Sequence, residues 1–356
     1  MMKTVERKET KSEKVGIITL YYNNDNYGGI AQAYALNEYI SKLGMDSELI
    51  SYRRSPVRPI GTKEKIQKDG MCHVLLEKLE CLPQKIYYRN ENRKAQKRYG
   101  EKLADKLIMR KKAFANSREK ICHSEVVTEE TIEEKLGNKY DWYVSGSDQI
   151  WKPGVLQKPY LFTFLDESKK RFSYASSITV TEFPEAYGET MRNGLNNYKW
   201  ISVREQSAKV YLEALLDRTV DVVVDPTLLL DQEDWNKVTA ERQVNGKYLF
   251  AYFLGDNRIQ RKRVQEFAKQ NNLKIVTLPH VEGKVRASDI GFGDIELYDI
   301  DLAKFFSLIK YAEYVCTDSF HAVVFSNIFE TNFYVVVFLS VKRSIYRTFS
   351  LYLHCE

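Results

Sequence analysis

Short apolar runs alternate with helix-like segments in two successive stretches of the chain, and this alternation constrains the fold more than any other feature. In the first stretch, residues 15–22 form a β-branched and aromatic run, and apolar residues at helical spacing follow from Ile30 to Leu43. In the second stretch, a strand-like run at 248–254 precedes a helical segment at 258–270. Strands that alternate with helices predict parallel sheets covered by helices, so the expected fold class is α/β.

The length and one polar segment predict the domain organisation. A chain of 356 residues fits two domains that each bury a core. The polar segment 231–246 marks the boundary, so we expect Rossmann-like domains over 1–230 and 231–356 that face each other across a cleft. Residues 63–139 are charged and helix-favouring, and we predict that they form a helical insertion in the first domain.

The charge distribution bears on the expected partners. The net charge of +6 is modest for this length and does not indicate nucleic acid as a partner. Residues 85–120 are strongly basic. A run of this kind is usually a solvated helix face, but it also fits peripheral contact with the anionic inner surface of a membrane.

Cysteine usage and hydropathy predict the compartment. Five cysteines are an odd number, and they show neither a CxxC motif nor ligand-like spacing to the five histidines. This usage predicts reduced thiols in a cytoplasm and no zinc site. The first apolar run is too short for a signal peptide, and no window has the length needed to span a bilayer.

A glycine-containing loop follows the first predicted strand. It contains Asn26, Tyr27, Gly28 and Gly29, and its two glycines let the backbone approach a ligand or a neighbouring loop. The loop lacks the dinucleotide fingerprint G-x-G-x-x-G. It is either part of a binding site or a turn that needs glycine only for its geometry.

The predicted strand at 141–144 leads into a loop with Asp148, Gln149 and Trp151. An acid, an amide and an indole suit a polyol, because sugars are held by carboxylate and amide hydrogen bonds and by stacking on an aromatic face. The alternative is that Asp148 caps a turn and Trp151 belongs to the core. The strand at 171–174 leads in the same way into a loop of small residues that includes Ser176.

Arg204 ends another predicted strand, at 200–203. A guanidinium at the carboxyl end of a strand suits bidentate recognition of a carboxylate or a phosphate better than a lysine would. The alternative is a structural ion pair with Glu205 or with a helix.

The segment 317–321 follows a short apolar run at 314–316 and precedes a second apolar run, which indicates a strand that turns directly into a buried helix. We expect Thr317 or Asp318 to be the N-cap, with Ser319 and His321 in or beside the first turn. Unpaired backbone N–H groups and the positive end of the helix dipole favour an anion there. The alternative is a capped core helix that carries one satisfied histidine.

These polar loops all follow predicted strands, and ligands bind at that edge of open parallel sheets. In order along the chain, six blocks resemble the signature blocks of the polysaccharide pyruvyl transferase family. They are Asn26-Tyr27-Gly28-Gly29 with the following Gln32-Ala33-Tyr34-Ala35-Leu36, Gly146-Ser147-Asp148-Gln149-Ile150-Trp151, Ser173-Tyr174-Ala175-Ser176, Ser202-Val203-Arg204-Glu205, Asp225-Pro226-Thr227-Leu228-Leu229 and Thr317-Asp318-Ser319-Phe320-His321.

The resemblance implies a two-domain fold similar to that of GT-B glycosyltransferases. It also implies transfer of pyruvate from phosphoenolpyruvate onto a sugar of a cell-surface or exopolysaccharide precursor, as a cyclic ketal. The first domain would bind the saccharide or lipid-linked saccharide acceptor, and the second would bind the donor. Neither a metal nor a further cofactor is required by this chemistry.

The matching motifs also imply residue roles. Arg204 and His321 would be catalytic and would bind the donor, with Ser319 and Ser176. Asp148 is our candidate for the base that activates the acceptor hydroxyl. The acceptor-binding set is Asn26, Tyr27, Gly28, Gly29, Gln149 and Trp151.

The last predicted strand, at 333–339, is followed by a segment shorter than the one the family usually has. This predicts a shortened C-terminal domain, which makes activity less certain than the fold. Two alternatives to the pyruvyl transferase stay open. One is a GT-B glycosyltransferase that uses a nucleotide sugar, and the other is a truncated, non-catalytic glycan-binding protein.

Overall fold

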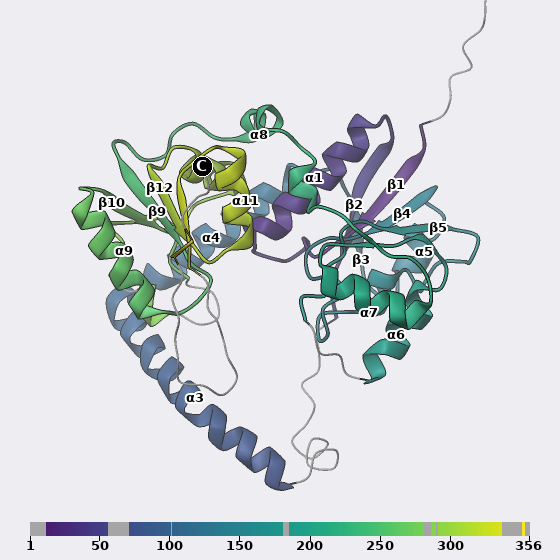
Figure 1. Cartoon of the computed structure of the whole chain (residues 1–356), viewed down its shortest axis with the longest axis horizontal. Helices are drawn as coiled ribbons and strands as arrows, with labels where there is room; N and C mark the ends of the chain where they lie inside the picture. Colours follow the sequence, from purple (N-terminus) through teal and green to yellow (C-terminus); the bar gives the residue numbers. More distant parts are fainter. Residues whose placement is uncertain are drawn as a thin grey trace, which may run out of the picture. The chain divides into compact units, whose positions relative to one another are not determined.

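The computed structural model describes residues 12–55, 71–100, 102–180, 185–280, 286–289, 291–336 and 351–352. The chain divides into two compact units, each with its own six-stranded sheet (Figure 1). Unit 1 comprises Met1–Pro56 and Arg118–Leu230, and unit 2 comprises Val57–Ser117 and Asp231–Glu356.

The sheet of unit 1 is parallel throughout and has the strand order β3-β2-β1-β4-β5-β6. Its strands are β1 (Lys14–Ile18), β2 (Asp46–Tyr52), β3 (His123–Val127), β4 (Trp142–Ser145), β5 (Lys170–Ser173) and β6 (Tyr198–Trp200). This is the strand order of a Rossmann domain, in which the chain reverses direction across the sheet between the first and fourth strands. The register places Ile18 beside Ser145, so the loops after β1 and β4 begin at the same point.

Helices and two short strands complete unit 1. They are α1 (Tyr27–Lys42), α5 (Ile132–Leu136), the 3₁₀ helix η1 (Lys158–Leu161), α6 (Glu185–Leu195), β7 (Ser202–Val203), α7 (Gln206–Leu216), β8 (Asp221–Val222) and the 3₁₀ helix η2 (Pro226–Leu228). β7 pairs with β8 in parallel, and Arg204 directly follows β7.

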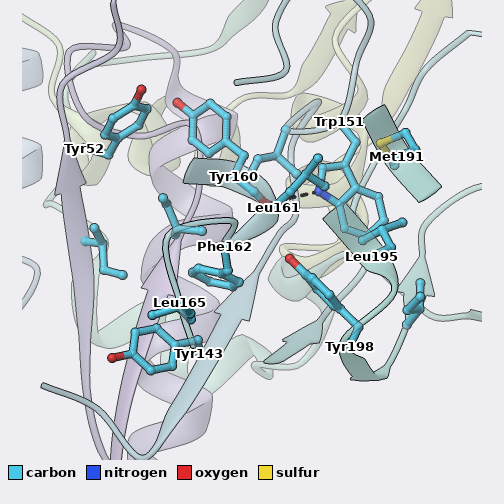
Figure 2. Packing of buried hydrophobic residues seen from close by; sticks show 14 of the residues in the cluster. Tyr52, Tyr143, Trp151, Tyr160, Leu161, Phe162, Leu165, Met191, Leu195 and Tyr198 are labelled. Carbon is cyan, nitrogen blue, oxygen red and sulfur yellow. Dashed lines mark hydrogen bonds between the residues drawn. The ribbon is translucent and has the colours of Figure 1, made fainter. Parts of the chain in front are cut away.

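An aromatic core lies in unit 1 (Figure 2). Trp151, Tyr143 and Phe162 are fully buried in it, and Tyr198 packs against the rings of Trp151 and Phe162. Each aromatic side chain buries roughly 150–250 Å². These rings therefore contribute a large part of the apolar surface that unit 1 removes from water.

The sheet of unit 2 repeats the same order as β11-β10-β9-β12-β13-β14. Its strands are β9 (Tyr248–Tyr252), β10 (Lys274–Thr277), β11 (Ile295–Glu296), β12 (Tyr314–Thr317), β13 (Phe333–Val336) and β14 (Leu351–Tyr352). All pairs are parallel except β13 with β14. The predicted fold class, with two Rossmann-like parallel-sheet domains, is confirmed by these two sheets.

The helices of unit 2 come from two parts of the chain. They are α3 (Met71–Tyr99), α4 (Lys102–Glu119), α8 (Gln232–Val238), α9 (Arg258–Gln270), the 3₁₀ helix η3 (Ala287–Asp289), α10 (Leu302–Lys310) and α11 (Phe320–Ile328). Trp235 of α8 packs edge-on against Phe306 of α10 and Phe325 of α11, and it is fully buried.

The basic helical segment differs from its predicted place. We expected 63–139 to be an insertion in the first domain, but residues 57–117 group with unit 2. Tyr87 of α3 donates a hydrogen bond to Asp256 (2.8 Å), and the backbone N–H of Leu302 donates to Ser117 of α4 (2.9 Å). These contacts, rather than position along the chain, decide where the segment packs.

Several other elements differ in detail. Strands β2 and β3 were not predicted, and neither were η3 and the short strand β11. The predicted shortening of the C-terminal domain concerns 340–356, and this segment lies outside the described residues except for β14.

Candidate active site

Two loops leave the sheet of unit 1 together, after β1 and after β4, and Gln32 of α1 joins them. Its side-chain amide donates to Thr19 (2.8 Å) and to the Gly29 carbonyl (2.7 Å), and its oxygen accepts from the backbone N–H of Ser147 (3.0 Å). Gln32 is fully buried, so these bonds lie out of competition with water. The carboxyl edge of the sheet is therefore a fixed platform at the place where Rossmann domains bind ligands.

The loop after β4 also packs directly on the loop after β5. Gly146 has a φ of +140°, and a Cβ there would lie 2.0 Å from the Tyr174 carbonyl oxygen. The Ser176 hydroxyl donates to the Ser145 carbonyl (3.0 Å), and the Ser177 N–H donates to the Ser147 carbonyl (2.9 Å). Only glycine permits this approach, and it brings Ser147 and Asp148 toward the end of β7.

Arg204, which follows β7, lies between two carboxylates. Its Nη1 donates to Asp225 at 2.6 Å, and its Nη2 lies 3.5 Å from Asp148. Asp225 also accepts from the hydroxyl of Thr227 (2.7 Å) and, at 3.4 Å, from that of Ser147. The side chain of Asp225 is fully buried, whereas those of Arg204 and Asp148 are 14% and 9% exposed.

The charges at this point favour a permanently protonated arginine. Burial alone would lower the pKa of Arg204, but the negative charges of Asp225 and Asp148 outweigh it, so the pKa is raised above its ordinary value. One guanidinium faces two carboxylates, and the shorter contact is the one to Asp225. We conclude that Asp225 anchors Arg204, while Asp148 makes the weaker contact.

Unit 2 has its own reversal point, where Tyr252 of β9 lies beside Thr317 of β12. Asp318 joins the two following loops, since its carboxylate accepts from the backbone N–H groups of Leu254 (2.6 Å) and Gly255 (2.7 Å). Thr317 donates to the Tyr252 carbonyl (2.6 Å) and accepts from the N–H of Ser319 (3.0 Å).

The N-cap of α11 is Ser319, which corrects the prediction that Thr317 or Asp318 takes this place. The Ser319 side chain accepts from the Ala322 N–H at 3.4 Å, and the hydrogen bonds of Thr317 and Asp318 to the β9 loop explain the shift. His321 lies in the first turn, is 8% exposed, and packs edge-on against the ring of Phe320 (5.1 Å between centroids). The first turn itself contains no acidic residue, and the carboxylate of Asp318, just before the N-cap, accepts hydrogen bonds from the β9 loop.

The structure places the predicted donor residues as follows. Arg204 and Ser176 lie in unit 1, and Ser319 and His321 lie in unit 2. Within unit 1, Asp148 is brought beside Arg204, as a shared site requires. Ser176 is fully buried, and its hydroxyl is used by the Ser145 carbonyl.

The predicted acceptor residues other than Trp151 lie at the start of α1 and in the loop after β4. Asn26 is the N-cap of α1, accepting from the N–H groups of Gly28 (2.9 Å) and Gly29 (3.3 Å), and Tyr27, Gly28 and Gly29 are buried in the first turn. Gln149 is half-buried.

The structure corrects the role predicted for Trp151. Its side chain is fully buried, and its indole N–H donates to the Tyr160 carbonyl at 3.4 Å (Figure 2). It therefore fills the core and offers no face to a sugar.

Two residues of the site were missed from the sequence. Asp225 was named only within one of the family blocks and given no role, although an acid before Pro226 and Thr227 is a turn signal that also fixes the carboxylate. Gln32 lies on the buried face of α1, where a polar side chain within an apolar stripe was the available signal.

Sequence and structure comparisons give different amounts of information. A search of curated proteins finds no match. Similar solved structures include a UDP-N-acetylglucosamine 2-epimerase described as putative, from Listeria monocytogenes (11% identity, TM-score 0.47, 87% of this chain and 75% of that one). The MnaA–UDP structure from S. aureus has 12% identity and a TM-score of 0.49 over 91% of this chain and 79% of that one. E. coli heptosyltransferase WaaC has 11% identity and a TM-score of 0.39, over 93% and 91%.

These solved structures are too dissimilar to assign a function to this chain. The family comparison assigns the family, because the family model matches residues 26–338, which include the Asn26 loop, Arg204 and His321. The chain therefore belongs to the polysaccharide pyruvyl transferase family.

Proposed function

We propose that the protein transfers pyruvate from phosphoenolpyruvate onto a sugar of a cell-surface or exopolysaccharide precursor, forming a cyclic ketal. Membership of the family supports this assignment. The observation that carries it is the state of Arg204, a permanently charged fork that is anchored by Asp225 and only loosely engaged by Asp148. A donor with a carboxylate and a phosphate suits such a fork.

The unequal contacts of Arg204 support one way in which a donor would bind. An incoming carboxylate or phosphate competes with Asp148 for Nη2, because that contact is 3.5 Å, whereas Asp225 keeps Nη1 at 2.6 Å. The exchange releases the Asp148 carboxylate at the moment when the donor is bound. Asp148 then becomes available to accept a proton from the acceptor hydroxyl.

The proposed reaction adds two sugar hydroxyls to one carbon of the donor and releases phosphate. An acid, for which His321 is our candidate, protonates the methylene carbon of phosphoenolpyruvate, which becomes the methyl group of the ketal. A sugar hydroxyl bonds to the neighbouring carbon and gives its proton to Asp148. The bond from that carbon to the phosphate oxygen breaks and inorganic phosphate leaves. A second sugar hydroxyl bonds to the same carbon and its proton passes to the released phosphate, which closes the ring.

The N-terminus of α11 would stabilise the donor's negative charge. Ser319 and His321 lie where the first backbone N–H groups of the helix and its dipole favour an anion. Both residues lie within the stretch that matches the family, and we assign them to the donor on that ground.

A thermal-shift panel tests the proposal. Phosphoenolpyruvate at about one hundred times its dissociation constant is expected to stabilise the protein by roughly 2.7 kcal/mol, and UDP-N-acetylglucosamine is expected to have no effect. Arg204→Lys keeps the charge but loses the fork, so its shift with phosphoenolpyruvate is expected to be smaller. Arg53→Lys, at an exposed arginine of the same unit, is the matched control and should behave as wild type.

Stabilisation by the nucleotide sugar without any by phosphoenolpyruvate would replace this proposal with a nucleotide-sugar glycosyltransferase. Binding of oligosaccharide without release of phosphate from phosphoenolpyruvate would instead indicate a non-catalytic glycan-binding protein.

A further inference from the structure

One side of helix α3 packs on the rest of unit 2. Glu91 and Ala95 are buried, and Arg98 contacts Glu296 at 3.0 Å. At 100° per residue, Glu91 and Ala95 lie only about 40° apart on the helix. The opposite side is directed to solvent, and in Figure 1 the N-terminal half of α3 extends away from the sheet of unit 2.

An exposed apolar row runs along the outward side of this N-terminal half. Its members are spaced by four, four, three and four residues, which places them on one face over four turns. They are Met71, Leu75, Leu79, Leu82 and Ile86, and their exposed fractions are 63%, 53%, 63%, 48% and 52%. Isolated exposed leucines are ordinary, but an unbroken row at helical spacing indicates a binding surface.

The same row continues as cations. Arg89, Arg93 and Lys97 follow Ile86 at spacings of three, four and four residues, and all three are exposed. At 100° per residue, an ideal helix places the eight residues of the row within an arc of about 80°, opposite Glu91 and Ala95. One helix face is therefore apolar over its first turns and basic over its last.

This order of residues argues against a second copy of the chain as the occupant. Two α3 helices paired in parallel would bring Arg89, Arg93 and Lys97 against the same cations. Pairing them antiparallel would bury those cations against leucines. Both arrangements oppose association.

An anionic lipid bilayer matches both halves of the row, since its interfacial region accepts apolar side chains and its phosphates attract arginine and lysine. The apolar part, from Met71 to Ile86, is about 22 Å long at 1.5 Å per residue. None of the helices that the structure describes is long and apolar enough to cross a membrane, so the fit is to the surface.

We propose that α3 is a membrane-surface element, which inserts Met71, Leu75, Leu79, Leu82 and Ile86 into the interface of an anionic bilayer and places Arg89, Arg93 and Lys97 against lipid phosphates. The helix is inclined, with its N-terminal half deeper than its C-terminal half. Such docking would bring the protein to lipid-linked saccharides, but binding to lipid does not depend on the proposed reaction.

Vesicle co-sedimentation of the full chain, without substrates, tests the proposal. We expect binding to phosphatidylcholine vesicles that contain phosphatidylglycerol, weaker binding to phosphatidylcholine alone, and a loss of binding at high salt. The variant Arg89→Gln/Arg93→Gln/Lys97→Gln is expected to bind about 100-fold more weakly. Leu75→Gln/Leu79→Gln, which keeps good helix formers, is expected to bind at least about 10-fold more weakly.

The matched control removes three exposed charges from α9, in Lys262→Gln/Arg263→Gln/Lys269→Gln. It should bind the anionic vesicles nearly as wild type does, because these charges do not continue the apolar row. Equal losses in the two triple variants would overturn the proposal in favour of non-specific attraction. So would an absence of vesicle binding, or sedimentation showing that the leucines of α3 hold a dimer. Circular dichroism of each variant establishes that it is folded.

Discussion

At Arg204 the two carboxylate contacts differ in length, and that difference predicts unequal consequences for removing each partner. Asp225→Asn removes the buried negative charge that contacts Arg204 at 2.6 Å. It is expected to lower the free energy of unfolding by about 2–3 kcal/mol. Asp148→Asn acts on a 3.5 Å contact and is expected to cost less than about 1 kcal/mol. Urea unfolding of the two variants measures the difference.

The two variants serve as controls for each other, because each removes one negative charge from the same arginine. Equal losses of stability would contradict the conclusion that Asp225 is the anchor. A loss confined to Asp148→Asn would reverse the assignment.

At the residue scale, the sequence predicted Arg204 as a site residue but did not predict its contact with Asp225. A strand followed by arginine is a local pattern, and it indicates where the guanidinium begins. The contact with Asp225 depends on the parallel pairing of β7 with β8, which joins residues about twenty positions apart. Trp151 shows the same limit, because a loop tryptophan can stack on a ligand or enter the core, and only the packing around it decides.

At the scale of the element, the turn from β12 into α11 depends on Asp318 more than on the helix cap. Asp318 receives two charge-assisted hydrogen bonds of 2.6 and 2.7 Å from the β9 loop, whereas the cap bond to Ser319 is 3.4 Å. Asp318→Ala is therefore expected to cost about 1.5–2 kcal/mol of unfolding free energy. Ser319→Ala is expected to cost about 0.5 kcal/mol.

Urea unfolding of Asp318→Ala and Ser319→Ala measures both values. Ser319→Gly provides the control, because glycine is nearly as good an N-cap and should leave stability almost unchanged. A larger loss in Ser319→Ala than in Asp318→Ala would show that the cap dominates the turn.

The strand and the helix on either side of this turn were predicted from apolar periodicity, and the structure confirms both. The cap was not, because Thr317, Asp318 and Ser319 are all good N-cap residues and their order alone does not rank them. The tertiary partners Tyr252, Leu254 and Gly255 engage the first two and leave Ser319 for the helix.

At the scale of the whole molecule, the alternation of strands and helices predicted two parallel sheets, because apolar residues recur at different spacings in strands and in helices. The assignment of the basic helices failed because packing does not follow chain order. Residues 57–117 lie in the chain between two parts of unit 1, yet Tyr87 and Ser117 form hydrogen bonds within unit 2. No local pattern in the sequence shows which of two sheets a following helix will cover.

Buried tyrosines in both units predict that the molecule loses stability in alkali. Burial raises the pKa of Tyr52 in unit 1 and of Tyr252 in unit 2 from 10.0 to about 12. The unfolded chain therefore loses these protons first. The free energy of unfolding should stay level below about pH 10 and fall between about pH 10 and pH 12, by about 1.4 kcal/mol per pH unit for each tyrosine.

Urea midpoints measured at about pH 8 and about pH 11, together with the ultraviolet absorbance of tyrosinate, check this expectation. Tyr52→Phe and Tyr252→Phe remove one titrating group each, so each variant should lose less stability over the same pH range than wild type. A fall as steep in both variants as in wild type would assign the alkaline loss to other groups. If the midpoint does not change up to about pH 11, the two hydroxyls titrate in the folded protein as they do in water.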